Sequence, residues 1–325
     1  MIKNFINNIK FWYSNARPYS APITLLCWLL IYTYSIYSGG NALYGIIAYL
    51  GIAVVHLATN LSDDYFDYKR LMANGEFTNN EKSIKCRYLR NGEATIDDLR
   101  NVILIMLLFA AVTGLILFWV SGWGVTFFAL CTLPIALFYS KLSSRGLGDL
   151  AVILAYGPLM YGGVYYVMTG SFSVDVFFLS ISSGIFVNTI LYAHMLMDYD
   201  SDVESGKTTL CTRLKTKDNA LNGLLAFYIV GYFFIAYFGI RTSNYLYFLT
   251  FLTIPMVFDL YNSLKMYNQN PKSIPEIRPW HYPLEGWEDK LNSGSAPFFF
   301  RFLYTRNITT FYMLLACIAT IVKKY

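Results

Sequence analysis

Charged residues are scarce in this chain. Of its 325 residues only 14% are charged, whereas 56% are hydrophobic, and soluble domains carry about a quarter charged residues. This balance indicates that lipid surrounds much of the chain. In a soluble protein the net charge of +5 would suggest a nucleic-acid partner. In a chain of this composition the basic residues instead serve as orientation signals, and no nucleic-acid partner is expected.

Several common functional motifs are also missing. The five cysteines are scattered, and none belongs to a spacing typical of a zinc site or to a close pair typical of a disulfide framework. The sequence has no GxSxG, HExxH or Walker A motif, so the corresponding hydrolase, metalloprotease and nucleotidase chemistries are not indicated. Lys3, Lys10 and Arg17 interrupt the first apolar residues, so a cleaved signal peptide is not expected.

Long apolar runs are abundant. A membrane-spanning helix needs about 20 mostly apolar residues, and nine segments meet this requirement. They lie at about 20–38, 42–60, 101–120, 123–140, 147–168, 173–195, 221–240, 244–263 and 307–322. We therefore predict an all-α integral membrane protein, a single domain over residues 1–325 with nine transmembrane helices. The longest segments between them, about 61–100 and 264–306, are predicted to be cytoplasmic loops.

The positions of the basic residues predict the orientation, because cytoplasmic loops carry an excess of Lys and Arg. With the N-terminus in the cytoplasm, all of the 25 Lys and Arg residues except Arg241, Lys323 and Lys324 fall on the cytoplasmic side. The largest group lies between the second and third predicted helices and consists of Lys69, Arg70, Lys82, Lys85, Arg87, Arg90 and Arg100. We expect a multi-pass protein of the cell (inner) membrane.

Two acidic clusters stand out, each where a predicted helix reaches the cytoplasmic side. The first contains Asn60, Asp63, Asp64 and Asp67, and the second contains Asp198, Asp200, Asp202 and Glu204. Spacings of three, four and seven put much of the first cluster on one helix face, and a spacing of four does the same for Asp198 and Asp202. Acids at the mouth of a membrane bundle are candidates for a functional site.

The chemistry of these clusters favours Mg²⁺. Like charges on one helix face repel each other without a cation, and Mg²⁺ takes a few carboxylates together with phosphate oxygens and water. Metal ions at both clusters would hold a diphosphate, with nearby Lys and Arg neutralising the departing pyrophosphate. The plainer alternative is that the acids are solvated loop residues. His56 and His194 are lone imidazoles, which we expect to be structural.

These clusters and several shorter elements resemble the UbiA superfamily of aromatic prenyltransferases, most nearly its 1,4-dihydroxy-2-naphthoate (menaquinone-type) branch. The two Asp motifs of that family are similar to residues 60–67 and to residues 198–210, where Gly206-Lys207-Thr208-Thr209 follows the acids. The family's Ala-Arg-Pro element is present at residues 16–18. Further similar stretches lie at residues 90–95, 146–149, 157–158 and 163–170. The resemblance runs in the correct order from about residue 16 to 215.

The resemblance implies a helix bundle with a central cavity and both Asp motifs at its cytoplasmic mouth. It implies transfer of a prenyl group from an isoprenyl diphosphate to an aromatic quinone precursor, with membrane lipid around the enzyme. The implied Mg²⁺ ligands are Asp63, Asp64, Asp67, Asp198 and Asp202, and all but Asp63 are the expected catalytic residues. The implied substrate contacts are Arg17, Asn60, Tyr139, Lys141, Arg145 and Lys207.

Departures from the branch leave the acceptor open. Residues 194–197, His-Met-Leu-Met, replace the branch's Asn-Asn-x-Arg, Asp63 stands where Asn is common, and Thr208 stands where Arg is common. Two other functions are compatible with the sequence, an ion or solute transporter with an acidic mouth and a UbiA-like binding protein without catalysis. Against transport, no charged residue lies in the middle of a predicted span, where transporters place their sites. Asp63 and Asp200 are the candidates for a general base.

Overall fold

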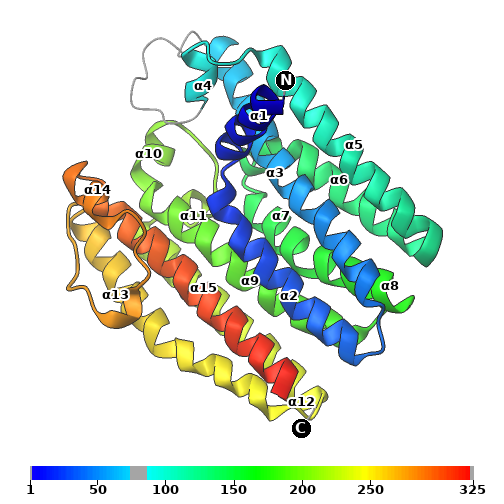
Figure 1. Cartoon of the computed structure of the whole chain (residues 1–325). Helices are drawn as coiled ribbons and strands as arrows, with labels where there is room; N and C mark the ends of the chain where they lie inside the picture. Colours follow the sequence, from blue (N-terminus) through cyan, green and yellow to red (C-terminus); the bar gives the residue numbers. More distant parts are fainter. Residues whose placement is uncertain (1, 74–85, 323–325) are drawn as a thin grey trace.

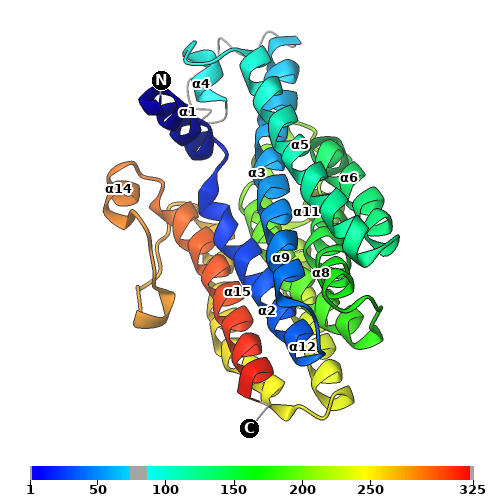
Figure 2. The same ribbon diagram turned by 45° about the vertical axis from the view of Figure 1, so that its right-hand side comes forward.

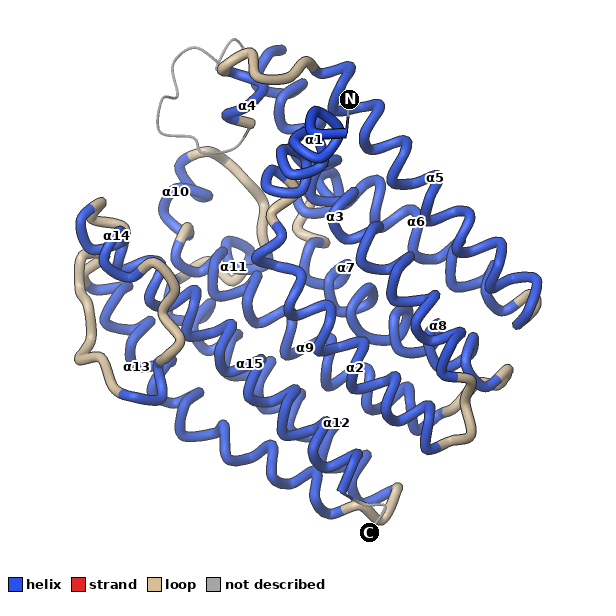
Figure 3. Tube along the Cα trace, viewed as in Figure 1, coloured by secondary structure: helices blue, strands red, loops and turns tan. Residues whose placement is uncertain are grey.

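The computed structural model describes residues 2–73 and 86–322, and within these ranges the regular elements are helical (Figures 1 and 3). In the first half they are α1 Ile2–Asn15, η1 Pro18–Ser20, α2 Ala21–Tyr37, α3 Ala42–Ala73, α4 Arg87–Arg90, α5 Ile96–Ser121, α6 Gly124–Ser143, α7 Gly148–Leu154, the π-helical turn η3 Ala155–Leu159 and α8 Met160–Thr169. In the second half they are α9 Val174–Met197, α10 Tyr199–Glu204, α11 Leu210–Arg213, α12 Lys217–Arg241, η4 Tyr245–Thr253, α13 Ile254–Gln269, η5 Pro279–His281, α14 Trp287–Asn292 and α15 Ala296–Val322. Of the basic residues used to predict orientation, Lys82, Lys85, Lys323 and Lys324 lie outside the described residues.

Seven helical segments in the described part of the chain are long and apolar enough to cross a membrane. They are Pro18–Tyr37, Ala42–Ala73, Ile96–Ser121, Gly148–Thr169, Val174–Met197, Lys217–Arg241 and Ala296–Val322. The prediction of an all-helical protein with several membrane spans is therefore confirmed. The other two predicted spans, 123–140 and 244–263, coincide with α6 and with η4 followed by α13. The count of nine and the orientation stay predictions.

The main difference from the sequence analysis concerns the predicted loops. α3 continues as a helix to Ala73, so the first acidic cluster lies on a helix, as its spacing indicates, and the predicted loop at 61–100 begins too early. Leu61 is fully buried against the neighbouring elements, and both Asp64 and Asp67 are buried as well. Helix propensity in this polar stretch is weak, and tertiary packing outweighs it.

The predicted loop at 264–306 is also more ordered than expected, because α13 reaches Gln269 and α15 begins at Ala296. One buried side chain fixes the connection between these helices. The guanidinium of Arg301 donates hydrogen bonds to the carbonyl oxygens of Ser263 at 2.8 Å, Ser273 at 3.0 Å and Pro297 at 2.7 Å. In Figure 2 the segment around α14 lies outside the bundle on the side of α15.

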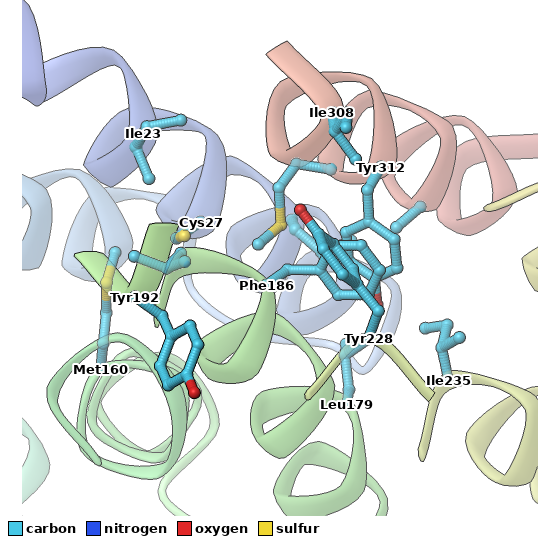
Figure 4. Close-up of a cluster of buried hydrophobic side chains, with 14 of the residues drawn as sticks. Ile23, Cys27, Met160, Leu179, Phe186, Tyr192, Tyr228, Ile235, Ile308 and Tyr312 are labelled. Atoms are coloured by element: carbon cyan, nitrogen blue, oxygen red, sulfur yellow. The ribbon is translucent and has the colours of Figure 1, made fainter. Parts of the chain in front are cut away.

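α9 is the central helix of the bundle, with 61% of its apolar window buried. Figure 4 shows part of the surrounding core, in which the ring of Phe186 stacks on that of Tyr312 at 3.6 Å. Glycine allows α9 to approach α7 and η3 closely. A Cβ at Gly184 would lie 2.5 Å from the oxygen of Ile153, and one at Gly157 would lie 2.7 Å from the oxygen of Ser180. The position of η3 therefore depends on these two glycines.

Both acidic clusters lie toward the same end of the bundle. The C-terminal end of α3, the short helices α4 and α10 and the N-terminus are at this end, whereas the C-terminus is at the other (Figures 1 and 2). α5 begins at this end, and a capping box fixes its first turn. The amide of Asp98 donates to Thr95 Oγ1 at 3.1 Å, and the amide of Thr95 donates to Asp98 Oδ2 at 3.0 Å.

Candidate active site

Arg17 connects the N-terminal segment to the first acidic cluster. It precedes η1 with a left-handed backbone, φ 57°, which is uncommon outside glycine. Its Nη2 donates to the carbonyl oxygen of Asn60 at 2.8 Å and to Asp64 Oδ1 at 2.6 Å, and it lies 3.4 Å from Asp63 Oδ2. Burial lowers the pKa of Arg17, but the charges of Asp64 and Asp63 raise it more, so the pKa lies above its ordinary value.

Asp64 is the most enclosed member of this group, with 6% of its side chain exposed. Besides Arg17, the hydroxyl of Tyr88 donates to its Oδ2 at 3.3 Å, and the thiol of Cys86 contacts its carbonyl oxygen at 3.3 Å. Burial and the charge of Asp64 raise the pKa of Tyr88, so this phenol stays protonated and acts as a donor. The structure thus holds a carboxylate in a buried position with a cation and a neutral donor.

The other predicted residues of the first cluster lie close by. Asn60 Nδ2 donates to the carbonyl oxygen of Ala16 at 2.9 Å, which ties α3 to the Ala-Arg-Pro element. One turn beyond Asp64, the carboxylate of Asp67 pairs with Arg70 at 3.1 Å. The ammonium of Lys141 lies 5.9 Å from the ring centre of Phe66, so this base of α6 faces the first cluster.

The second cluster is built around a helix end. Asp202 lies on α10, and Gly206 then adopts φ 67°, which turns the chain back on itself. As a result Lys207 donates from its amide to the carbonyl oxygen of Asp202 at 2.8 Å and from Nζ to Asp202 Oδ1 at 3.1 Å. Asp202 is buried, and its Oδ2 has no hydrogen-bond partner among the described residues. An unpartnered buried carboxylate oxygen is costly, and a cation or donor supplied by a ligand would satisfy it.

Asp198 and Asp200 are in different surroundings. Asp198 Oδ2 lies 3.1 Å from Nδ1 of His194, one turn earlier on α9, and its side chain is 36% exposed. Phe298 and Phe302 of α15 pack edge-on against the His194 ring. Asp200 is exposed and pairs with Lys217. His194 therefore sits beside a predicted ligand, whereas Asp200 points away from the enclosed part of the site.

Residues between the clusters join them into one region. Tyr139, half-buried on α6, interacts electrostatically with Asp63 and Asp149. Burial raises the pKa of the Cys211 thiol to about 12, and the nearby carboxylates of Asp149 and Asp202 contribute to this shift. Asp149 thus interacts electrostatically with Tyr139, which is near Asp63 of the first cluster, and with Cys211, which is near Asp202 of the second. Within the described residues, however, no three acidic, His or Cys side chains meet as a ready metal site.

Arg145 is placed by its backbone. It forms an isolated parallel bridge with Thr208, and its carbonyl oxygen accepts a hydrogen bond from Arg213 at 2.8 Å. This contact joins the α6–α7 connection to the segment after the second cluster, while the Arg145 side chain is exposed. Of the predicted substrate contacts, Asn60 is itself part of the first cluster, Arg17 pairs with the acids of that cluster, and Lys207 pairs with Asp202 of the second.

Two polar groups were not recognised as site residues from the sequence. Asp149 is buried at the start of α7 with Asn188, whose Nδ2 donates to Asp149 Oδ1 at 3.1 Å, and Asp149 Oδ2 and Asn188 Oδ1 have no partner among the described residues. An acid at the edge of an apolar run could have indicated Asp149. The second group surrounds His56, which was interpreted as structural. Its partners come from distant parts of the chain, so no local pattern reveals them.

Comparison with known proteins agrees with this arrangement. The UbiA prenyltransferase family matches residues 23–278. A 1,4-dihydroxy-2-naphthoate octaprenyltransferase of Haemophilus influenzae is 26% identical over 229 residues, covering 65% of this chain and 72% of the relative. The solved structure of a digeranylgeranylglyceryl phosphate synthase superposes with a TM-score of 0.62 at 14% identity, covering 97% of this chain and 99% of that one. A UbiA homolog from Archaeoglobus fulgidus bound to GPP and Mg²⁺ has a TM-score of 0.56 at 12% identity, covering 95% and 99%.

The family match extends over well more than half of the chain, and the solved relatives share its fold over almost their whole length. The chain therefore belongs to the UbiA prenyltransferase family and is a multi-pass integral membrane prenyltransferase.

Proposed function

We propose that this enzyme transfers a prenyl group from an isoprenyl diphosphate to an aromatic quinone precursor in a Mg²⁺-dependent reaction. The observation that carries this proposal is the pair of enclosed carboxylates with basic partners, Asp64 with Arg17 and Asp202 with Lys207, at one end of a membrane bundle. The A. fulgidus homolog of the same fold is bound to GPP and Mg²⁺. The first candidate acceptor is 1,4-dihydroxy-2-naphthoate, the substrate named for the H. influenzae relative.

The residues present fit Mg²⁺. The candidate ligands are carboxylate oxygens, which Mg²⁺ prefers, and it needs only one or two from the protein when phosphate oxygens and water complete its shell. Asp202 Oδ2 is buried and has no partner among the described residues. Asp63, Asp64, Asp67, Asp198 and Asp202 would hold the ion, as the resemblance implies. When bound, Mg²⁺ supplies Lewis-acid stabilisation of the charge that develops on pyrophosphate.

Side chains of the protein itself would neutralise the diphosphate and stabilise the allylic cation. Arg17 and Lys207 already lie against the carboxylates and are placed to neutralise the diphosphate. Lys141 and Tyr139 lie on α6 beside the segment of α3 that carries the first cluster, where a tyrosine ring can stabilise an allylic cation by cation–π attraction. A site enclosed by apolar helices limits hydrolysis of that cation. The prenyl chain would lie among these helices and the surrounding lipid.

We further propose nine crossings, with the N-terminus and the site's mouth on the cytoplasmic side of the cell membrane. α6 has 20 residues, and at 1.5 Å per residue a helix of this length matches a hydrocarbon core of about 30 Å. η4 with 9 residues and α13 with 16 are together longer than α6 and so also long enough to span this thickness. Both clusters lie at one end of the bundle, so an even number of crossings must separate the end of α3 from the end of α9. The segments between them are α5, α6, α7 to α8, and α9, and their number is even only if α6 crosses as well.

The test is product formation by the purified protein in lipid nanodiscs. Geranylgeranyl or farnesyl diphosphate is supplied with a panel of aromatic acceptors headed by 1,4-dihydroxy-2-naphthoate, with and without Mg²⁺. We expect a Mg²⁺-dependent prenylated product, whose mass identifies the acceptor. Pyrophosphate release without any prenylated acceptor would reject the panel but keep the diphosphate chemistry. Binding of the diphosphate without release would instead support a protein that has lost catalysis.

A further inference from the structure

His56 is surrounded by hydroxyl groups from three different segments of the chain. Its Nε2 lies 2.7 Å from Ser20 Oγ, at the end of η1. Its Nδ1 lies 2.7 Å from Thr24 Oγ1 on α2 and 2.7 Å from the hydroxyl of Tyr156 on η3. The hydroxyls of Thr24 and Tyr156 are 3.4 Å apart. This arrangement brings four polar side chains together within apolar helices, where isolated polar groups are unfavourable.

The hydrogen bonds assign the tautomer of His56. Ser20 Oγ donates to the carbonyl oxygen of Arg17 at 2.8 Å and accepts from Asn60 Nδ2 at 3.2 Å. Because the single proton of Ser20 is directed to that carbonyl, His56 donates from Nε2–H to Ser20. Nδ1 of His56 is then a free base, and it accepts a hydrogen bond from the hydroxyl of Tyr156 or of Thr24. A neutral imidazole with its basic nitrogen against a phenol is a proton acceptor.

This group is continuous with the predicted diphosphate site. His56 lies one turn before Asn60 on α3, and Ser20 contacts both residues. The same Asn60 carbonyl oxygen accepts from Arg17, which pairs with Asp64. The order along this path is therefore Asp64, Arg17, Ser20 with Asn60, His56 and Tyr156, and it leads from the acidic cluster toward the interior of the bundle.

Tyr156 and His56 also retain accessible surface, unlike the sealed tyrosines of the core. Both are only partly buried, whereas Tyr161, five residues after Tyr156, is 0% exposed. Thr24, which contacts both side chains, is buried, with only 3% of its surface exposed. The segment that carries Tyr156 is a π-helical turn, a feature frequent at functional sites. The phenol is thus held by its neighbours, and the side chains of the pair are not sealed in the core as Tyr161 is.

The two acids considered as bases from the sequence are less suited to this role. Asp63 Oδ2 is already engaged in an ion pair, 3.4 Å from the Arg17 guanidinium. Asp200 is exposed and paired with Lys217. By contrast, the hydrogen-bond partners of His56 among the described residues are all hydroxyls, and the Arg17 guanidinium acts on the ring only through its charge.

We propose that Tyr156 and His56 form the proton-accepting pair for the aromatic acceptor, an inference that rests on the proposed function. The O–H bond of a ring hydroxyl breaks and its proton passes to the Tyr156 oxygen, while the Tyr156 proton passes to His56 Nδ1. The electron-rich ring carbon forms the new C–C bond, and the allylic C–O bond breaks with its electron pair leaving on pyrophosphate. The ring carbon then loses its own proton to water or its carboxylate as CO₂, and the bonding electron pair returns to the ring. His56 returns its proton through Tyr156 to the ring oxygen, which restores the hydroxyl and the neutral pair.

The test separates ionisation of the diphosphate from transfer to the acceptor. Tyr156→Phe and His56→Gln are compared with the unmodified protein in nanodiscs, and Tyr247→Phe is the matched control. Tyr247 also loses a hydroxyl pair, the 2.6 Å contact with Thr320, but this pair lies in the buried core. Pyrophosphate release is measured without an acceptor, and product is measured with acceptors whose hydroxyls differ in acidity.

We expect transfer to fall about 100-fold or more in Tyr156→Phe and His56→Gln, which is the range of general base catalysis. Pyrophosphate release without an acceptor stays close to that of the unmodified protein, and more acidic acceptors restore part of the transfer. Tyr247→Phe retains transfer. Equal losses of release and transfer, or a loss that does not depend on acceptor acidity, would overturn the assignment. Absence of any Mg²⁺-dependent release by the unmodified protein would instead reject the proposed function.

Discussion

At the scale of single residues, the two acidic clusters differ in how their carboxylates are balanced. Asp64 has a guanidinium at 2.6 Å and a phenol at 3.3 Å. Asp202 has one partner, the ammonium of Lys207, whose side chain is 42% exposed, and one oxygen without a partner among the described residues. A buried carboxylate that is only half satisfied lowers stability. We therefore expect the Asp202 carboxylate to lower the stability of the fold while it serves the proposed reaction.

The variant Asp202→Asn tests this conflict. A half-exposed ion pair contributes at most about 1 kcal/mol, and a neutral amide costs less to bury than a carboxylate, so the unfolding temperature should stay the same or rise. Prenyl transfer should fall about 100-fold, as when one electrostatic contact to the transition state is removed. Thermal unfolding and product formation are measured on the same sample. Unchanged transfer in a well-folded variant would remove Asp202 from the site.

Single residues also mark the limit of sequence analysis. The acids of both clusters and Arg17 could be proposed from spacing and resemblance, and the structure places Arg17 against Asp63 and Asp64. His56 could not, because its partners Ser20, Thr24 and Tyr156 are up to 100 residues away in sequence. Hydrogen bonds between distant segments have no periodicity that a sequence pattern can report.

At the scale of elements, the close approach of α9 to η3 determines where Tyr156 lies. Gly184 on α9 faces Gly157 on η3, and the nearest atoms to an added Cβ at either position belong to the backbone. Backbone atoms cannot rotate away as a side chain can, so the helices would have to separate. The glycine pair thus couples the packing of the core helix to the position of the Tyr156 hydroxyl.

Gly184→Ala should therefore lower stability and transfer together. A Cβ 2.5 Å from the oxygen of Ile153 overpacks the interface, which costs about 1–3 kcal/mol. Gly114→Ala on α5 is the control, because nothing lies within 4 Å of its added Cβ and alanine favours a helix by about 1 kcal/mol. Thermal unfolding in detergent compares the two. Equal effects of both substitutions would contradict the close approach described here.

Helix ends were less predictable than helix existence. The apolar runs of α2, α5, α9, α12 and α15 could be recognised by length alone. The spacing of the first cluster favours a helix as far as Asp67, but the continuation of α3 to Ala73 could not be recognised, because residues 61–100 were expected to form a loop. The same holds for α15, whose start at Ala296 depends on the buried Arg301 and its carbonyl partners. In each case tertiary contacts, not local preference, extend the helix.

At the scale of the whole molecule, nine crossings and a cytoplasmic N-terminus can be tested by labelling. Single cysteines at Ser144, Ser243 and Ser293 are introduced into a protein without its five native cysteines and treated with a membrane-impermeant thiol reagent in sealed vesicles. We expect the cysteines at 144 and 293 on the side of the N-terminus and the one at 243 on the other. Labelling of position 144 from the side opposite the N-terminus would show that α6 does not cross the membrane. Labelling of position 293 from that side would show that η4 and α13 do not cross.

We propose that the two acidic clusters form one Mg²⁺-dependent site for a prenyl diphosphate. The most direct measurement is Mg²⁺-dependent pyrophosphate release from geranylgeranyl diphosphate by the purified protein in nanodiscs, compared with Asp64→Asn and Asp198→Asn. We expect release by the unmodified protein and its loss in both variants, while each variant keeps the helical content and unfolding transition of a folded bundle. Full release by either folded variant would contradict it.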